Sequence, residues 1–252
     1  MIDHQQSATK RDCQLRVTPY QLPITDYQLP RPARFLFLAT ALMEFRSSIP
    51  FGVTLLAAGA SSRMGQPKLL LPWGNTSVLG HVIGQWRAVG AAQIAVVLSE
   101  SNTAIAAELD RAGFPGKDRI LNPEPDRGMF SSIQCAARWE DWRSGLALWA
   151  VTLGDQPHLR AETLRTLADF AAARPSLFCQ PQNRAGRARH PVVLPEDLFR
   201  AVADAPDVTF RDFLRRHEAF RALCPMDDPG LDLDIDTPED YQRAMKLSDR
   251  KP

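Results

Sequence analysis

Two glycines and two basic residues lie close together after an apolar run of this sequence. The segment Leu56–Lys68 reads Leu-Ala-Ala-Gly-Ala-Ser-Ser-Arg-Met-Gly-Gln-Pro-Lys. Glycines let backbone N–H groups approach phosphate oxygens, and Arg63 and Lys68 supply positive charge. The hydroxyls of Ser61 and Ser62 can add donors. The spacing excludes a P-loop, because Lys68 lies three residues beyond the second glycine, and the glycines do not have the GxGxxG spacing of a dinucleotide fold. The loop predicts a phosphate site of another kind.

Carboxylates occur in two further places. Asp155 follows an apolar run directly, where it could cap the next helix or, beside a phosphate site, bind Mg²⁺. In an extended strand, Asp232, Asp234 and Asp236 would share one face, where like charges repel unless a cation or solvent relieves them. The second cluster is therefore either a solvated face or part of a metal site.

The elements that must position these residues alternate along the chain. Apolar runs at 51–58, 94–98 and 146–153 predict buried strands, and shorter strands are expected at 177–180 and 191–194. Helical spacing and end signals predict helices at about 77–89, 102–112, 130–142, 161–173 and 196–203, and from Pro238 onward. This order predicts an α/β domain with a mostly parallel sheet covered on both faces, in which ligands bind beyond the carboxyl ends of the strands.

Residues 1–48 differ from the rest, with scattered prolines and little periodicity. We interpret them as a poorly ordered N-terminal extension, or as the product of a start assigned too early, with Met43 as the alternative start. Residues 49–252 then form the domain.

Composition and charge argue against several functional classes of protein. The 252 residues carry a net charge of +1, without the basic footprint of a nucleic-acid binder. No apolar run reaches the roughly 20 residues that a membrane span needs. The four cysteines include no CxxC pair, which excludes zinc-site spacing and favours reduced thiols in a cytoplasmic protein.

The loop pattern Leu-Ala-Ala-Gly-x-Ser-x-Arg-Met-Gly-x-x-Lys resembles the signature of the MobA-like NTP transferases, and most of all the molybdenum cofactor cytidylyltransferases. The resemblance spans about residues 51–247. It implies a Rossmann-like three-layer α/β domain of the nucleotide-diphospho-sugar transferase type, whose loop holds the triphosphate of an NTP. The loop residues expected at the nucleotide are Leu56, Ala57, Ala58, Gly59, Ser61, Ser62, Arg63, Gly65 and Lys68.

The same resemblance assigns roles elsewhere. It implies Mg²⁺ on Asp155 and Asp236, with Asp234 as the second choice within the acidic cluster. Ser131 and Ser132 either cap the helix predicted over 130–142 or face the nucleotide. A further set, expected to border the acceptor, is Arg189, His190 and Pro191. The family usually has glycine where this chain has Arg189, whose charge could strengthen phosphate binding or signal a different acceptor.

The resemblance implies transfer of CMP from CTP onto molybdopterin with release of pyrophosphate, with Arg63, Lys68 and Asp155 as catalytic residues. CTP is expected rather than GTP because Ala58 stands where guanylyl-transferring relatives have glycine. Two alternatives remain: a sugar- or polyol-phosphate nucleotidyltransferase, and a non-catalytic molybdopterin-binding maturation module. The expected partners are the NTP, a phosphorylated pterin acceptor, and a molybdoenzyme or its maturation chaperone.

Overall fold

The computed structural model describes residues 49–59 and 64–248. The expected extension over residues 1–48 lies outside the described residues. So do Ser61, Ser62 and Arg63 of the segment Leu56–Lys68, which is called the glycine-rich loop below. The elements described below all belong to the unit Ser48–Pro252.

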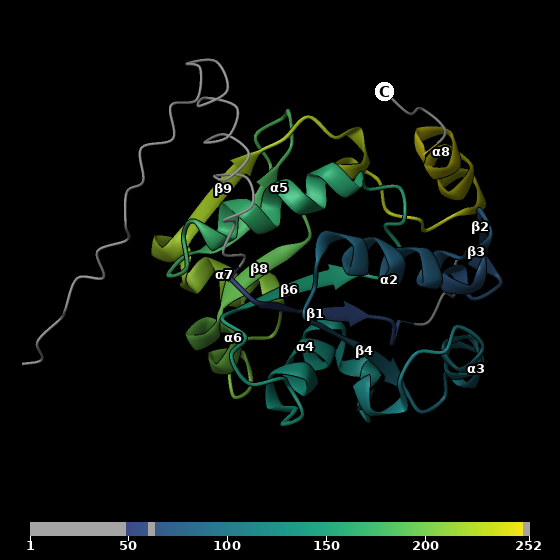
Figure 1. The fold of residues 1–252 in the computed structure, drawn as a ribbon, viewed down its shortest axis with the longest axis horizontal. Helices are drawn as coiled ribbons and strands as arrows, with labels where there is room; N and C mark the ends of the chain where they lie inside the picture. The colour runs from purple at the N-terminus through teal and green to yellow at the C-terminus, as the bar shows by residue number, and fades with distance from the viewer. Residues whose placement is uncertain (1–48, 60–63, 249–252) are drawn as a thin grey trace, which may run out of the picture. The chain divides into compact units, whose positions relative to one another are not determined.

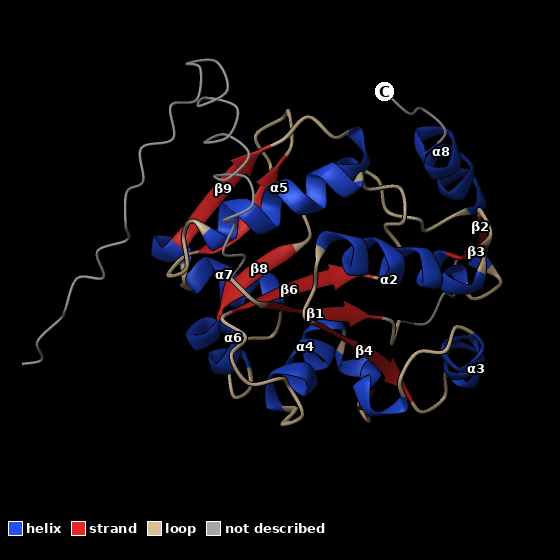
Figure 2. Cartoon of the chain, viewed as in Figure 1, coloured by secondary structure: helices blue, strands red, loops and turns tan. Residues whose placement is uncertain are grey.

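Seven strands form one sheet in the order β5-β4-β1-β6-β8-β7-β9 (Figure 2). Strand β8 runs antiparallel to both of its neighbours, and the other pairs are parallel, so the predicted mostly parallel sheet is confirmed. The strands are β1 (Phe51–Leu56), β4 (Gln93–Ser99), β5 (Arg119–Asn122), β6 (Leu148–Leu153), β7 (Phe178–Gln182), β8 (Val192–Pro195) and β9 (Arg221–Pro225).

Strands β1, β4 and β6 are buried on both faces because helices cover both sides of the sheet. Strand β1 pairs with β4 and β6, and Leu56 at its end lies opposite Val97 and Leu153. The carboxyl ends of β1 and β6 therefore open at the same edge of the sheet, where their following loops meet.

Helices cover each face of the sheet (Figure 1). One apolar core joins α2 (Val78–Val89), α3 (Thr103–Arg111), α5 (Ala161–Ala172) and α8 (Pro238–Ser248) to one face. A second core joins α4 (Met129–Arg138), α6 (Glu196–Val202) and α7 (Phe210–Arg216) to the other face. The result is the predicted three-layer α/β arrangement.

Helix α4 is shorter than the sequence predicted. The expected helix ran to Trp142, but α4 ends at Arg138 because Trp139 adopts an extended backbone. The chain then folds back, and the Trp142 indole N–H donates to the Ala136 carbonyl at 2.8 Å. Trp142 also packs edge-on against Trp149 of β6, so burial of its ring replaces continuation of the helix.

Several short elements were not predicted. They are β5, β9, α7 and a hairpin of β2 (Pro72–Trp73) and β3 (Thr76–Ser77), together with short 3₁₀ turns that include η2 (Lys68–Leu70), η4 (Pro125–Arg127) and η6 (Pro229–Asp232). Within the described residues, none of the helices has the length and apolar character needed to cross a membrane. Cys135, Cys179 and Cys224 are free thiols.

Candidate active site

A cavity of about 260 Å³ lies where the carboxyl ends of β1 and β6 meet. The Gly154 N–H donates to the Leu56 carbonyl at 3.1 Å, which holds the two strand ends together. Gly65 has a left-handed backbone, with φ of +64°, as expected for a tight turn in the glycine-rich loop. The cavity is lined by Leu56, Ala57, Ala58, Gly59, Lys68, Leu69, Pro125, Gly128, Met129, Ser132, Leu153, Gly154 and Asp155.

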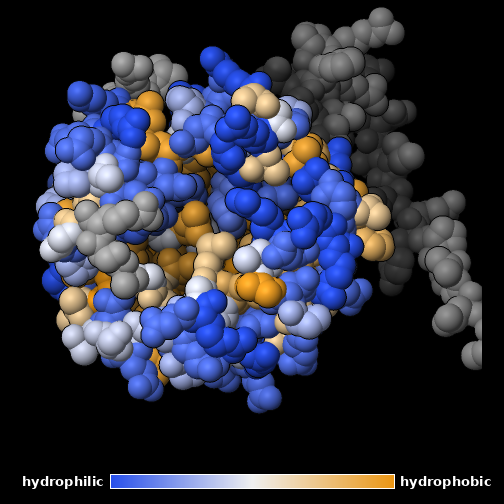
Figure 3. All heavy atoms as spheres, turned by 180° about the vertical axis from the view of Figure 1, so that it is seen from behind, coloured by the Kyte–Doolittle hydropathy of each residue, from blue (hydrophilic) through white to orange (hydrophobic). Residues whose placement is uncertain are grey.

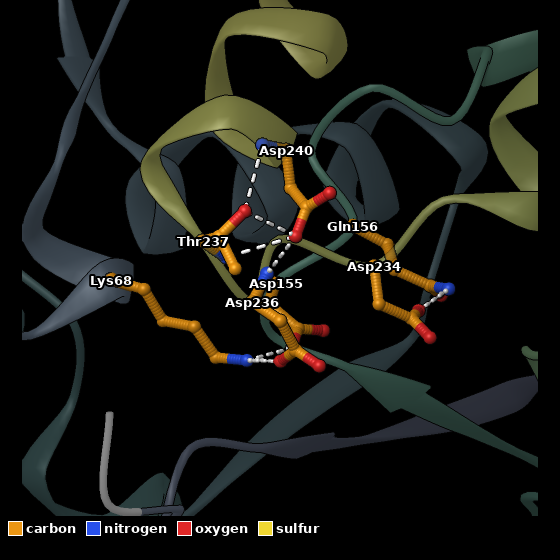
Figure 4. Close-up of polar contacts among 7 residues, drawn as sticks. All are labelled: Lys68, Asp155, Gln156, Asp234, Asp236, Thr237 and Asp240. Atoms are coloured by element: carbon orange, nitrogen blue, oxygen red, sulfur yellow. Dashed lines mark hydrogen bonds and ion pairs between the residues drawn. The ribbon is translucent and has the colours of Figure 1, made fainter. Parts of the chain in front are cut away.

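Lys68 connects the two acidic positions (Figure 4). Its ammonium donates to Asp155 Oδ2 at 2.5 Å and to Asp236 Oδ1 at 3.0 Å. The buried side chain of Leu69 anchors the short η2 turn that carries the lysine. Burial alone would lower the pKa of Lys68, but the two carboxylates outweigh it and raise the pKa above the usual value. Lys68 is therefore a fixed positive charge at the cavity.

Asp155 is the carboxylate at the end of β6, and it lies largely inside the domain. Burial raises its pKa above the usual value, and the charge of Lys68 opposes that rise. Its Oδ2 is bonded to Lys68, whereas its Oδ1 is buried and has no hydrogen-bond partner within residues 49–59 and 64–248. An unsatisfied buried carboxylate oxygen is costly without a donor or a cation, so it fits a cation ligand.

The residues present fit a divalent ion that keeps part of its water or phosphate shell. In the described part of the chain, no group of three His, Cys, Asp or Glu residues could enclose a metal. Asp155 and Asp236 share one lysine and so lie close together. Mg²⁺ is commonly held by one or two carboxylates plus phosphate oxygens, which matches such a pair.

The acidic segment is not a strand, so the expectation of three aspartates on one face is wrong. The chain forms η6 and then runs irregularly through Asp236. Each carboxylate has its own donor, which separates the like charges. The pairs are Asp232 with Arg189 Nη2 at 2.6 Å and Asn183 at 2.5 Å, Asp234 with Gln156 at 2.8 Å, and Asp236 with Lys68 at 3.0 Å.

Two residues that sequence reasoning missed hold this segment in place. His158 Nε2 bonds to the carbonyls of Gly230 at 3.1 Å and Leu233 at 2.9 Å. The buried Asp228 accepts from the Thr163 hydroxyl of α5 at 2.6 Å. Burial lowers the pKa of His158, so the ring is neutral at pH 7 and can serve as a donor to the carbonyls. A lone histidine after Asp155 gave no signal that it would contact a segment more than 70 residues away.

Helix α8 begins with a reciprocal cap directly after Asp236. The Thr237 hydroxyl accepts from the Asp240 N–H at 3.2 Å, and Asp240 accepts from the Thr237 N–H at 2.9 Å. The Thr237 hydroxyl also donates to the Asp240 carboxylate at 2.8 Å, and this hydrogen bond, followed by that from Arg243, lowers the pKa of Asp240. The helix begins at Pro238, as predicted, and Glu239 and Asp240 lie in its first turn. The cap fixes the backbone on one side of Asp236.

The two serines of α4 are held by one amide. Asn122, at the end of β5, donates to the hydroxyls of Ser131 and Ser132, each at 2.9 Å. Neither serine caps the helix, contrary to one expectation: Gly128 takes the cap position, and Ser131 donates back to its carbonyl at 2.8 Å. Ser132 lines the cavity and Ser131 is not among its lining residues. Asn122 was not predicted because its four-residue strand was not.

A second cavity, of about 810 Å³, adjoins the first and shares Met129 and Leu153 with it. Arg189 and His190 line it, and a cis peptide joins His190 to Pro191. Burial lowers the pKa of His190, so its ring is neutral at pH 7. The charge of Arg189 is compensated by Asp232. Seen from behind, the surface has a hollow in which hydrophobic residues lie among hydrophilic ones (Figure 3).

Comparison with known proteins gives a family and several relatives. A family model described as the MobA-like NTP transferase domain matches residues 53–220. Nicotine blue oxidoreductase of Paenarthrobacter nicotinovorans is 28% identical over 200 residues, covering 76% of this chain and 94% of that protein. A probable molybdenum cofactor guanylyltransferase of Carboxydothermus hydrogenoformans is 29% identical over 117 residues, covering 46% of this chain and 52% of that protein. The crystal structure of Rv0371c from Mycobacterium tuberculosis H37Rv matches with a TM-score of 0.65 and 25% identity, covering 79% of this chain and 99% of that chain.

Proposed function

The chain belongs to the MobA-like NTP transferase family, a family of nucleotidyltransferases, and we propose that it moves CMP from CTP onto molybdopterin and releases pyrophosphate. The observation that carries the proposal is the contact of Lys68 with both Asp155 and Asp236 at a cavity formed by the glycine-rich loop. A binding module has no evident need for this charged cluster, which supports a reaction at phosphate.

In the proposed reaction, an oxygen of the acceptor phosphate attacks the α-phosphorus of CTP. The bond from the α-phosphorus to the bridging oxygen breaks, and pyrophosphate leaves with the electron pair. Lys68 stabilises negative charge on the phosphates, and Arg63, which lies outside the described residues, does so from the loop. Asp155 and Asp236 would hold Mg²⁺, which supplies charge neutralisation on the phosphates when bound. The protein's main task is positioning and charge compensation.

Two features support the choice of substrates. The relative named a molybdenum cofactor guanylyltransferase points to molybdopterin as the acceptor. Ala58 lines the cavity, and its methyl group takes up room where guanylyl-transferring relatives have glycine. We therefore favour the smaller pyrimidine nucleotide, CTP, over GTP.

The test is pyrophosphate release from CTP, GTP, ATP and UTP with Mg²⁺ and molybdopterin. We expect release with CTP, and a loss of about 10²-fold or more in Asp155→Asn, as for other groups that stabilise charge in a transition state. Asp197→Asn, at an exposed aspartate of α6, is the matched control and should keep its activity. Pyrophosphate release with GTP in preference to CTP would refute the assignment of cytidylyl transfer. Absence of release with every NTP, despite molybdopterin binding, would sink the enzyme assignment for this acceptor.

A further inference from the structure

Four arginines from three segments of the chain line the second cavity. Arg189 follows β7, Arg211 and Arg215 lie on α7, and Arg221 begins β9. Guanidinium groups bind phosphate through paired N–H donors, so the cavity is suited to an anionic ligand. The question is which of these charges is available to a ligand.

Three of the four charges are already compensated by carboxylates. Each of these arginines contacts an aspartate or glutamate, and a new anion would have to compete with that partner. The pairs are Arg189–Asp232 at 2.6 Å, Arg215–Asp212 at 2.8 Å and Arg221–Glu218.

Arg211 differs from the other three. It is exposed and lines the cavity, and its side chain makes no ion pair or hydrogen bond with any residue of the described ranges. Its backbone is held firmly, because the neighbouring Phe210 is buried and its ring stacks on Phe130 with centroids 6.1 Å apart. The guanidinium therefore extends from a fixed point with its donors unused.

The same aromatic contact joins α7, which carries Arg211, to the start of α4 beside the first cavity. Phe130 follows Met129, one of the two residues that line both cavities. Asp232, Asp234 and Glu218 also line the second cavity. Asp232 and Glu218 are paired with arginines, whereas Asp234 accepts from the neutral amide of Gln156, so its negative charge disfavours a phosphate beside it. Arg211 is therefore the arginine of this cavity whose charge is most available to a phosphate.

We infer that Arg211 binds the phosphate of the acceptor and holds it at the junction of the two cavities. The inference rests on the proposed function, since it gives that phosphate the position from which it attacks the nucleotide. It also changes the role expected for Arg189: that side chain holds Asp232, and Arg211 meets the substrate. The acceptor class that fits is a phosphate monoester whose polar body lies against the buried amides of Gln156 and Gln180.

The first test measures steady-state transfer from CTP onto molybdopterin with the full chain. Arg211→Ala should raise the acceptor KM by about 10-fold, the size expected for loss of a charge-assisted hydrogen bond, and leave the KM for CTP unchanged. Arg211→Lys should recover part of the loss, since it restores the charge without the paired donors. Arg165→Ala, at an exposed arginine of α5, is the control and should match the wild type. An unchanged acceptor KM in Arg211→Ala overturns the inference and leaves the proposed function standing.

A second test does not depend on turnover. Inorganic phosphate is titrated, at constant ionic strength, into the full chain carrying ¹⁵N-labelled arginine. The Nε–H signal that is absent from Arg211→Ala should shift saturably, and the signal absent from Arg165→Ala should not. If the wild type transfers no nucleotide, the proposed function fails, and this titration still decides whether Arg211 binds phosphate. A signal of Arg211 that does not move overturns the inference.

Discussion

Replacing Gly154 by alanine should damage the site without removing any charged or polar group. Gly154 lies between the last residue of β6 and Asp155, and its N–H bonds to the Leu56 carbonyl of β1. A Cβ at this position would lie 2.8 Å from that same carbonyl oxygen and 3.2 Å from Leu69 Cδ2. The side chain of Leu69 can adjust, but the carbonyl is part of the sheet, so relief of that contact requires the strand ends to move.

The expected losses of stability and activity follow from the distance between the added Cβ and the Leu56 carbonyl oxygen. Relief of the contact with the Leu56 oxygen, from 2.8 Å to an ordinary 3.4 Å, needs a shift of about 0.6 Å between the ends of β1 and β6. Added atoms in a packed site typically cost about 1–3 kcal/mol of stability. Asp155, the next residue, would move by a similar distance relative to Lys68. Because a misplacement of about 1 Å can cost 10²-fold in rate, we expect a loss of about 10-fold or more in transfer.

The assay is urea unfolding, followed by fluorescence of the buried tryptophans, together with pyrophosphate release by the same samples. Gly84→Ala is the matched control, because Gly84 is exposed on α2 and a Cβ there meets no atom within 4 Å. That control should gain up to about 1 kcal/mol from helix propensity and keep its activity. Wild-type stability and activity in Gly154→Ala would refute the close approach of the two strand ends as the constraint.

Two further predictions concern the residues that hold the acidic segment. Thr237→Ala removes the cap of α8 and should cost about 1 kcal/mol in the free energy of unfolding; a cost no larger than that of Thr166→Ala, at an exposed threonine in the middle of α5, would exclude the capping role. The folded-state pKa of His158 lies below its usual value of 6.5, so the unfolded chain takes up the proton first. The stability due to neutral His158 is therefore complete above pH 6.5 and is lost as the pH falls toward the folded-state pKa. In His158→Gln, the drop in unfolding free energy between about pH 7.5 and pH 5.5 should be smaller than in the wild type, and an equal drop would contradict the buried neutral ring.

The central part of the fold could be predicted because its physical signals are local. Strands β1, β4 and β6 are buried on both faces, so each reads as a continuous apolar run. Strand β5 has only four residues, and the exposed Leu121 interrupts its buried positions. Strand β9 has only Cys224 fully buried, since it forms an edge of the sheet. The antiparallel direction of β8 leaves no trace in a short apolar segment, because direction is decided by the partners.

The site, like the fold, has parts that local sequence signals predict and parts that depend on distant contacts. Lys68, Asp155 and Asp236 were selected from short motifs, and the structure brings all three into contact. Their roles in catalysis and metal binding remain predictions. The shape of the acidic segment could not be predicted, because it depends on contacts of His158 and Asp228 with distant parts of the chain. Alternating aspartates suggest a strand only when no such partners compete for the backbone.

Lys68 also accounts for how two carboxylates can lie close together in this site. Two like charges in a partly buried site repel strongly, and burial already raises the pKa of Asp155. The ammonium between them replaces that repulsion with two charge-assisted contacts, at 2.5 and 3.0 Å. The three groups together carry one net negative charge, which leaves the cluster able to take up a cation along with a nucleotide. The same lysine can therefore maintain the geometry of the carboxylate pair and, in the proposed reaction, meet the phosphates.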